Sequence, residues 1–122
     1  VLNRIRGPFN VALPTQAAAI AVLEDEPFAE ASKAHNDRWL PWFDAELRAL
    51  GLTVVPSNAN FVLVRFPEDP KQSADAANAF LNDRGVIPRK VGAYGLPDCL
   101  RITIGTESEL RAAVDALAAF MR

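Results

Sequence analysis

Arg101 has the residue type and the setting best suited to bind an anion. The segment Leu100–Ile104 alternates apolar and polar side chains, which predicts a half-buried strand. Arg101 and Thr103 should share one face of that strand, and its apolar residues should share the other. A guanidinium fixed on a strand can grip a carboxylate or phosphate through two hydrogen bonds. Strand geometry alone nevertheless favours an ordinary arginine that is solvated or paired with a surface acid.

Several other chemistries lack the residues that they require. None of the six glycines falls in a dinucleotide-binding or P-loop pattern, so no phosphate loop is predicted. His35 is the only histidine, and no Cys, Asp or Glu accompanies it at metal-ligand spacing. Ser57 and Ser73 have no histidine partner in a recognisable arrangement. The sequence therefore predicts neither a metal site nor a serine nucleophile.

The composition is that of a globular domain without affinity for nucleic acid or membranes. Half of the 122 residues are hydrophobic, which is enough for a real core. The net charge is −2 and the basic residues form no run, which argues against a nucleic-acid partner. No apolar stretch is long enough to span a bilayer. Cys99 is the only cysteine and cannot form an internal disulfide, so a cytoplasmic location is expected.

Four strands are predicted around the candidate arginine. They cover Leu52–Val55, Phe61–Phe66, Val86–Val91 and Leu100–Ile104. The second is apolar at nearly every position, which predicts a central strand with both faces covered. Pro88 has no amide hydrogen, so the third strand should lie at an edge of the sheet or end there.

Helices are predicted on both sides of these strands. They cover Thr15–Leu23, Phe28–Leu50, a segment that Ser73 caps and that ends at Arg84–Gly85, and Glu107–Met121. Pro41 should kink the long second helix or divide it. Thr106 and Glu109 form a capping box before the last helix. This order predicts an α+β fold: a small antiparallel or mixed sheet of about four strands, with helices packed on it and a long connecting helix before it.

Four stretches in a fixed order give the sequence a family resemblance. They are Arg4–Val11, Pro56–Phe66, Gly85–Arg89, and Leu100–Gly105 preceded by Tyr94–Pro97. The chain resembles the carboxy-terminal part of histidinol-phosphate aminotransferases, which are pyridoxal-phosphate (PLP) enzymes of aminotransferase fold type I. The resemblance implies that residues 1–26 are a remnant of the large PLP-binding domain. It further implies that residues 27–51 are the connecting helix and residues 52–122 the small domain.

The resemblance also implies a reaction and partners for the full-length protein. The reaction is the conversion of histidinol phosphate and 2-oxoglutarate to imidazole acetol phosphate and glutamate, in the cytoplasm. The chain begins at Val1 rather than Met, which together with the resemblance indicates a fragment. Its apolar residues Phe9, Val11, Ile20 and Leu23 should then lack a packing partner and favour a homodimer or higher self-association. A threonine-phosphate decarboxylase-like fragment and a non-catalytic α+β binding or interaction module stay open as alternatives.

By resemblance, the site residues of this chain bind substrate rather than cofactor. Arg101 and Arg89 are expected to grip the phosphate or carboxylate of a phosphorylated amino alcohol or amino acid, and Asn60 to line the same pocket. Tyr94 has a hydroxyl that could reach the substrate, although a tyrosine covering an apolar edge would look the same.

No catalytic and no cofactor-binding residue is assigned in this chain. Its only lysines are Lys33, Lys71 and Lys90, and none stands in the family's Schiff-base motif. PLP is therefore expected in the full-length enzyme only, and the chain alone is expected to be inactive.

Overall fold

The computed structural model describes residues 11–122, in two compact units. The first unit ends at His35, and the second comprises Asn36–Arg122. Of the Arg4–Val11 motif, only Val11 lies within the described residues. This division into compact units does not test the expected domain boundaries at residues 26 and 51, so those boundaries stay a prediction.

The first unit contains helix α2, Leu13–Glu24, and the beginning of helix α3, Glu26–Ala49. Pro14 stands in the first turn of α2, where its missing amide hydrogen costs no helical bond. Asp25 accepts a hydrogen bond from the amide of Phe28 at 3.1 Å and so caps α3. None of the residues of α2 is buried, Ile20 and Leu23 included.

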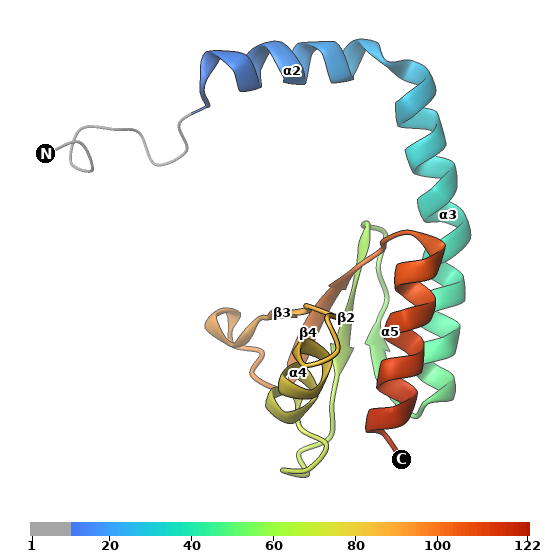
Figure 1. Cartoon of the computed structure of the whole chain (residues 1–122), viewed down its shortest axis with the longest axis vertical. Coiled ribbons are helices and arrows are strands. Elements are labelled where there is room, and N and C mark those ends of the chain that lie inside the picture. Colours follow the sequence, from blue (N-terminus) through green and yellow to red (C-terminus); the bar gives the residue numbers. More distant parts are fainter. Residues whose placement is uncertain (1–10) are drawn as a thin grey trace, which may run out of the picture. The chain divides into compact units, whose positions relative to one another are not determined.

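The second unit is an antiparallel sheet of four strands in the order β1-β2-β4-β3 (Figure 1). The strands are β1 (Thr53–Val55), β2 (Phe61–Arg65), β3 (Arg89–Lys90) and β4 (Cys99–Thr103). The helices are α4 (Ala74–Asn82), the short 3₁₀ helix η1 (Gly92–Tyr94) and α5 (Glu107–Phe120). The predicted α+β class is confirmed, and the sheet is antiparallel throughout.

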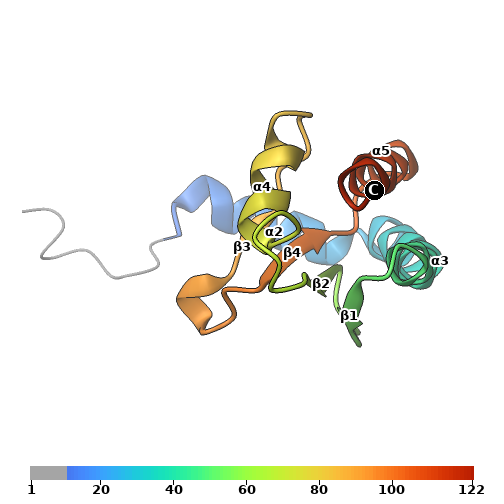
Figure 2. The same cartoon turned by 90° about the horizontal axis from the view of Figure 1, so that it is seen from below.

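Helices cover one face of this sheet only. Figures 1 and 2 show α4 and α5 on the same side of it, and their buried residues share one core with the carboxy-terminal half of α3. Along β2, Val62 and Val64 are buried, whereas Phe61 and Leu63 on the other face are only half-buried. The prediction that both faces of β2 are covered is therefore wrong for the described residues. Apolar residues of β2 lie on both faces of the sheet, but the helices of the second unit pack on only one of these faces.

Two further predictions need correction. The third strand is Arg89–Lys90 rather than Val86–Val91. It lies at the edge of the sheet, as Pro88 indicated, since a residue without an amide hydrogen cannot extend the ladder. Helix α3 continues through Pro41, so the predicted division does not occur, whereas the alternative outcome, a kink, stays a prediction. Trp39 and Phe43, on either side of the proline, are buried in the core.

The part of the chain that the structure describes contains neither a membrane-spanning helix nor a cluster of metal ligands. None of its helices combines the length and hydropathy that crossing a bilayer requires. No group of three or more His, Cys, Asp and Glu side chains in residues 11–122 is placed to hold a metal ion.

Candidate functional site

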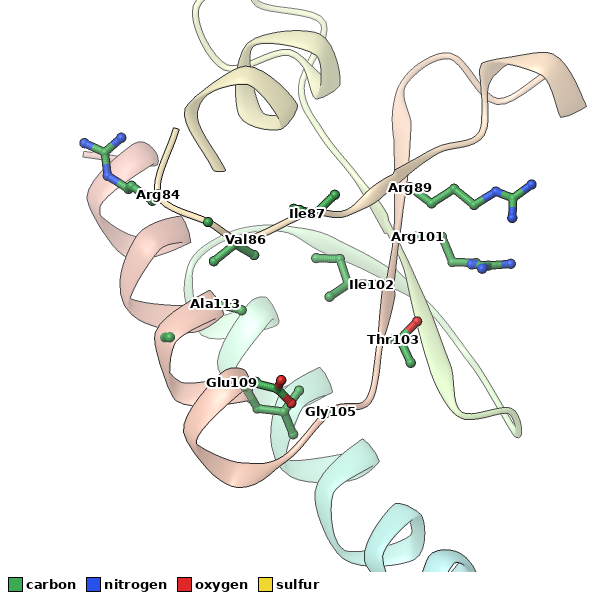
Figure 3. A pocket seen from close by; sticks show the side chains of 13 residues that line it. Arg84, Val86, Ile87, Arg89, Arg101, Ile102, Thr103, Gly105, Glu109 and Ala113 are labelled. Atoms are coloured by element: carbon green, nitrogen blue, oxygen red, sulfur yellow. The ribbon is translucent and has the colours of Figure 1, made fainter. Parts of the chain in front are cut away.

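The uncovered face of the sheet carries a pair of arginines in register. Arg89 of β3 and Arg101 of β4 are directly opposite each other. Figure 3 shows both side chains extending in the same direction, away from Ile102 and Ala113, which belong to the helix-covered side. Arg101 is also opposite Leu63 of β2. Two consecutive strands thus present two guanidinium groups on the same face of the sheet.

Arg101 is held without an acidic partner. Its Nε is buried and makes no hydrogen bond, and its guanidinium carbon lies 5.0 Å from the centre of the Phe61 ring. The ion pairs among the described residues join other cations to acids, and neither Arg89 nor Arg101 takes part in them. A buried N–H that bonds nothing is costly unless a ligand accepts from it. This unbonded N–H makes Arg101 a candidate for binding an anion.

Arg89 is more exposed and has one polar neighbour. Its Nη2 donates a hydrogen bond to the hydroxyl of Tyr94 at 3.3 Å. Tyr94 ends η1, and Gly95 follows it with φ of 80°, a left-handed conformation that glycine adopts without strain. This turn brings the chain back from β3 towards β4. The structure therefore places Tyr94 as a partner of Arg89, which the sequence alone did not indicate.

Both arginines line a hollow of about 580 Å³ beside β4. Its lining also includes Arg84, Glu109, Ile87 and Thr103. Arg84 is already engaged, since its Nη1 donates to the Phe80 carbonyl at 3.2 Å and its guanidinium stacks on the Phe80 ring.

Glu109 is also committed, to the start of α5. Its Oε2 accepts from the amide and the hydroxyl of Thr106, each at 2.8 Å, as the predicted capping box requires. These hydrogen bonds hold the pKa of the Glu109 carboxyl below its ordinary value of 4.5. The guanidinium groups of Arg89 and Arg101 point away from Ile102 and Ala113, out of this hollow and over the other face of the sheet (Figure 3). An anion is the ligand that this arrangement favours.

Asn60 is not brought to this pair. It is exposed and does not line the hollow, and its carbonyl accepts a hydrogen bond from the amide of Ile104 at 2.8 Å. The structure therefore gives Asn60 a backbone role where β2 begins. Its expected part in substrate binding stays a prediction.

The lysines of this chain stand elsewhere. Lys90 is opposite Leu100, on the helix-covered side of the sheet, and forms an ion pair with Asp75 of α4. Lys71 is exposed in the loop before α4, and Lys33 belongs to the first unit. No lysine of the described residues lines the hollow. The described residues therefore do not fit a PLP that is held covalently at this site.

Sequence reasoning missed Phe61 as a neighbour of Arg101. Its apolar position in β2 was predicted, but the contact depends on the register of β2 with β4, which pairs Phe61 with Thr103. No local pattern encodes a pairing between strands that are this far apart in sequence.

Comparisons with known proteins agree over nearly the whole chain. The sequence profile of the family Aminotransferase class I and II matches residues 1–117. The chain is 55% identical over 121 residues to the histidinol-phosphate aminotransferase of Paramagnetospirillum magneticum. This alignment covers 99% of the chain and 33% of that protein. It is 50% identical over 120 residues to that of Rhodopseudomonas palustris, covering 98% and 33%. The chain thus spans about a third of the length of these curated relatives.

A solved structure resembles the fold as well. A Burkholderia pseudomallei protein assigned to the aminotransferases superimposes with a TM-score of 0.80 and 30% sequence identity. The match covers 99% of this chain and 36% of that one.

Proposed function

Since the chain belongs to the class I and II aminotransferases, we propose that it is the carboxy-terminal segment of a histidinol-phosphate aminotransferase and supplies the site for the substrate's anionic group. The relatives at 55% and 50% identity bear that name, which supports this choice of substrate. The proposed reaction of the full-length enzyme transfers the amino group of histidinol phosphate to 2-oxoglutarate. Localisation in the cytoplasm belongs to the same proposal.

One observation carries the proposal. Arg89 and Arg101 are directly opposite in neighbouring strands and have no acidic partner within residues 11–122, and the Arg101 Nε is buried and unbonded there. Like charges at such positions destabilise a sheet unless something neutralises them. A phosphate or carboxylate between them would accept from both guanidinium groups.

The contribution of this segment to catalysis would be orientation. Two guanidinium groups on adjacent strands fix the anionic end of the substrate, and hence the direction in which its amine points. We assign PLP and the groups that transfer protons to the remainder of the full-length protein, because no described lysine stands at this site. The expectation that the chain alone is inactive and binds no PLP stays a prediction.

The test is Arg101→Lys in the full-length enzyme. The fold should persist, since the packing of β4 is unchanged, but the two-pronged hydrogen bonding is lost. The loss should be about 1.5–3 kcal/mol, the contribution of a hydrogen bond to a charged group. It should appear in kcat/KM for histidinol phosphate, with the absorbance of the cofactor unchanged.

Arg84→Lys is the matched control. Arg84 lines the same hollow but is engaged by the Phe80 carbonyl, so kcat/KM should stay near wild type. Full activity in Arg101→Lys, or loss of cofactor rather than of substrate affinity, would make Arg101 a structural residue. Measuring release of carbon dioxide from threonine phosphate separates the decarboxylase alternative.

A further inference from the structure

The ring of Phe61 lies where it can control the position of the Arg101 guanidinium. The guanidinium carbon is 5.0 Å from the ring centre, within the range of a cation–π interaction. Phe61 is paired with Thr103 in the ladder of β2 and β4, which makes it the diagonal neighbour of Arg101. Both side chains therefore stand on the face of the sheet that the helices leave uncovered.

The backbone around Phe61 is held on both sides of the ring. The Ser57 hydroxyl donates to the carbonyl of Phe61 at 2.7 Å and accepts from the amide of Ala59 at 3.1 Å. The carbonyl of Asn60 accepts from the amide of Ile104 at 2.8 Å, which ties the start of β2 to the end of β4. These bonds fix the main chain from which the ring extends towards Arg101.

Arg101 depends on the ring because no acceptor holds its Nε. Arg89 donates a hydrogen bond to the Tyr94 hydroxyl, whereas the Arg101 Nε is buried without a hydrogen bond. An aromatic ring contacts the flat side of a guanidinium and leaves the N–H groups at its edge for hydrogen bonds. Phe61 can therefore hold the group without competing with a ligand.

We propose that Phe61 is a positioning residue, which holds the guanidinium of Arg101 ready for the substrate's anion. The inference rests on the proposed function, since it requires Arg101 to bind that anion. A side chain that is already ordered loses less conformational entropy when the ligand arrives, so the ring strengthens anion binding through Arg101. Phe61 itself need not touch the ligand.

The test uses the 122-residue chain and inorganic phosphate. The Nε–Hε resonance of Arg101, assigned by its loss in Arg101→Lys, should carry an aromatic ring-current shift and should move on titration with phosphate. Phe61→Leu should abolish the ring-current shift and weaken phosphate binding about two- to fivefold, the size of a cation–π contribution near a surface. Phe61→Tyr keeps an aromatic face and should retain both properties. Val55→Ala, on the same face of the sheet, is the control and should change neither.

The outcomes separate the two ideas. If Phe61→Leu keeps the wild-type resonance and phosphate affinity with its core methyl resonances intact, Phe61 does not position Arg101 and the inference is overturned. The same holds if Phe61→Tyr behaves like Phe61→Leu. If phosphate does not move the Arg101 resonance even in the wild type, the anion site itself fails, and the proposed function falls together with the inference.

Discussion

Arg89 and Arg101 carry like charges at opposite positions of two antiparallel strands. Side chains in such a pair have β-carbons about 5 Å apart, and like charges there oppose strand pairing. The register that places the two arginines of the proposed anion site together therefore weakens the sheet when no anion is present. Anion binding and the stability of this sheet edge must be linked, because a ligand that binds only the folded form stabilises it.

Arg89→Gln should raise the free energy of unfolding in the absence of anions. The gain should be up to about 1 kcal/mol, because it removes the repulsion across the pair. Phosphate should raise the urea midpoint of the wild type and raise that of Arg89→Gln less, since one of the two cationic donors is gone. Urea denaturation followed by circular dichroism, with and without phosphate, measures both effects.

Arg111→Gln is the control for a general loss of positive charge. Arg111 pairs with Glu107 at 2.9 Å on α5 and does not line the hollow. Its replacement should leave the response to phosphate as in the wild type. Equal responses of the wild type and Arg89→Gln would show that Arg89 does not take part in binding anions.

At the scale of the elements, the capping box at the N-terminus of α5 should stabilise the helix to a degree that depends on pH. Glu109 has a pKa below its ordinary value of 4.5, because the Thr106 amide and hydroxyl bind its carboxylate. A lowered pKa contributes stability above that ordinary value, and the contribution is lost as the pH falls through the folded-state pKa. The capping box should therefore weaken in acid.

Glu109→Gln should remove this pH dependence and keep the cap. The glutamine side chain can still accept from the Thr106 amide but carries no titrating proton. The free energy of unfolding, measured by urea from neutral pH to about pH 3, should fall more steeply in the wild type once the pH drops below 4.5. Parallel profiles for the two proteins would contradict the link. Thr106→Ala should cost about 1 kcal/mol at neutral pH, because it removes the cap itself.

Elements with local signals were predictable from the sequence, and those that depend on packing were not. The strand around Arg101 and the cap of α5 follow from alternation and from two residues three positions apart, so they were predicted nearly to the residue. The length of β3 was not predicted correctly, because the strand extends only as far as its residues pair with β4. The half-buried face of β2 was also missed, because an apolar strand does not show whether helices cover one of its faces or both.

The candidate site was predictable in part. Residue type and strand position singled out Arg101, but only the family resemblance favoured a binding role for Arg101 and Arg89, and that role stays a prediction. That they stand opposite each other, with Phe61 against one of them, depends on a register that no short stretch of sequence contains.

For the whole molecule, exposed apolar residues in the first unit predict association. Leu13, Ile20, Leu23 and Phe28 are between 59% and 82% exposed, and α2 buries none of its residues. Apolar surface of this kind favours contact with a second copy. We expect the chain to sediment as a dimer or larger species at high concentration, as the sequence also indicated.

The variant Ile20→Glu with Leu23→Glu should shift this equilibrium towards the monomer. Charge on both exposed positions of α2 makes burying them in an interface unfavourable. Ile87→Gln is the control, since Ile87 is 83% exposed in the second unit and lies outside α2. A wild-type chain that stays monomeric in sedimentation equilibrium would contradict the prediction.

The pairing of β2 with β4 sets when this site can come into existence. Residues 61–65 must find residues 99–103 across an intervening segment that contains α4, β3 and η1, and bringing the two strands together costs chain entropy before the contacts are gained. During synthesis the strand with Phe61 emerges well before the strand with Arg101, so one edge of β2 stays unpaired until residues 99–103 have been made. An edge in that state is prone to pair with another chain. Translation that stalls between these strands would therefore yield an aggregation-prone intermediate that lacks the anion site.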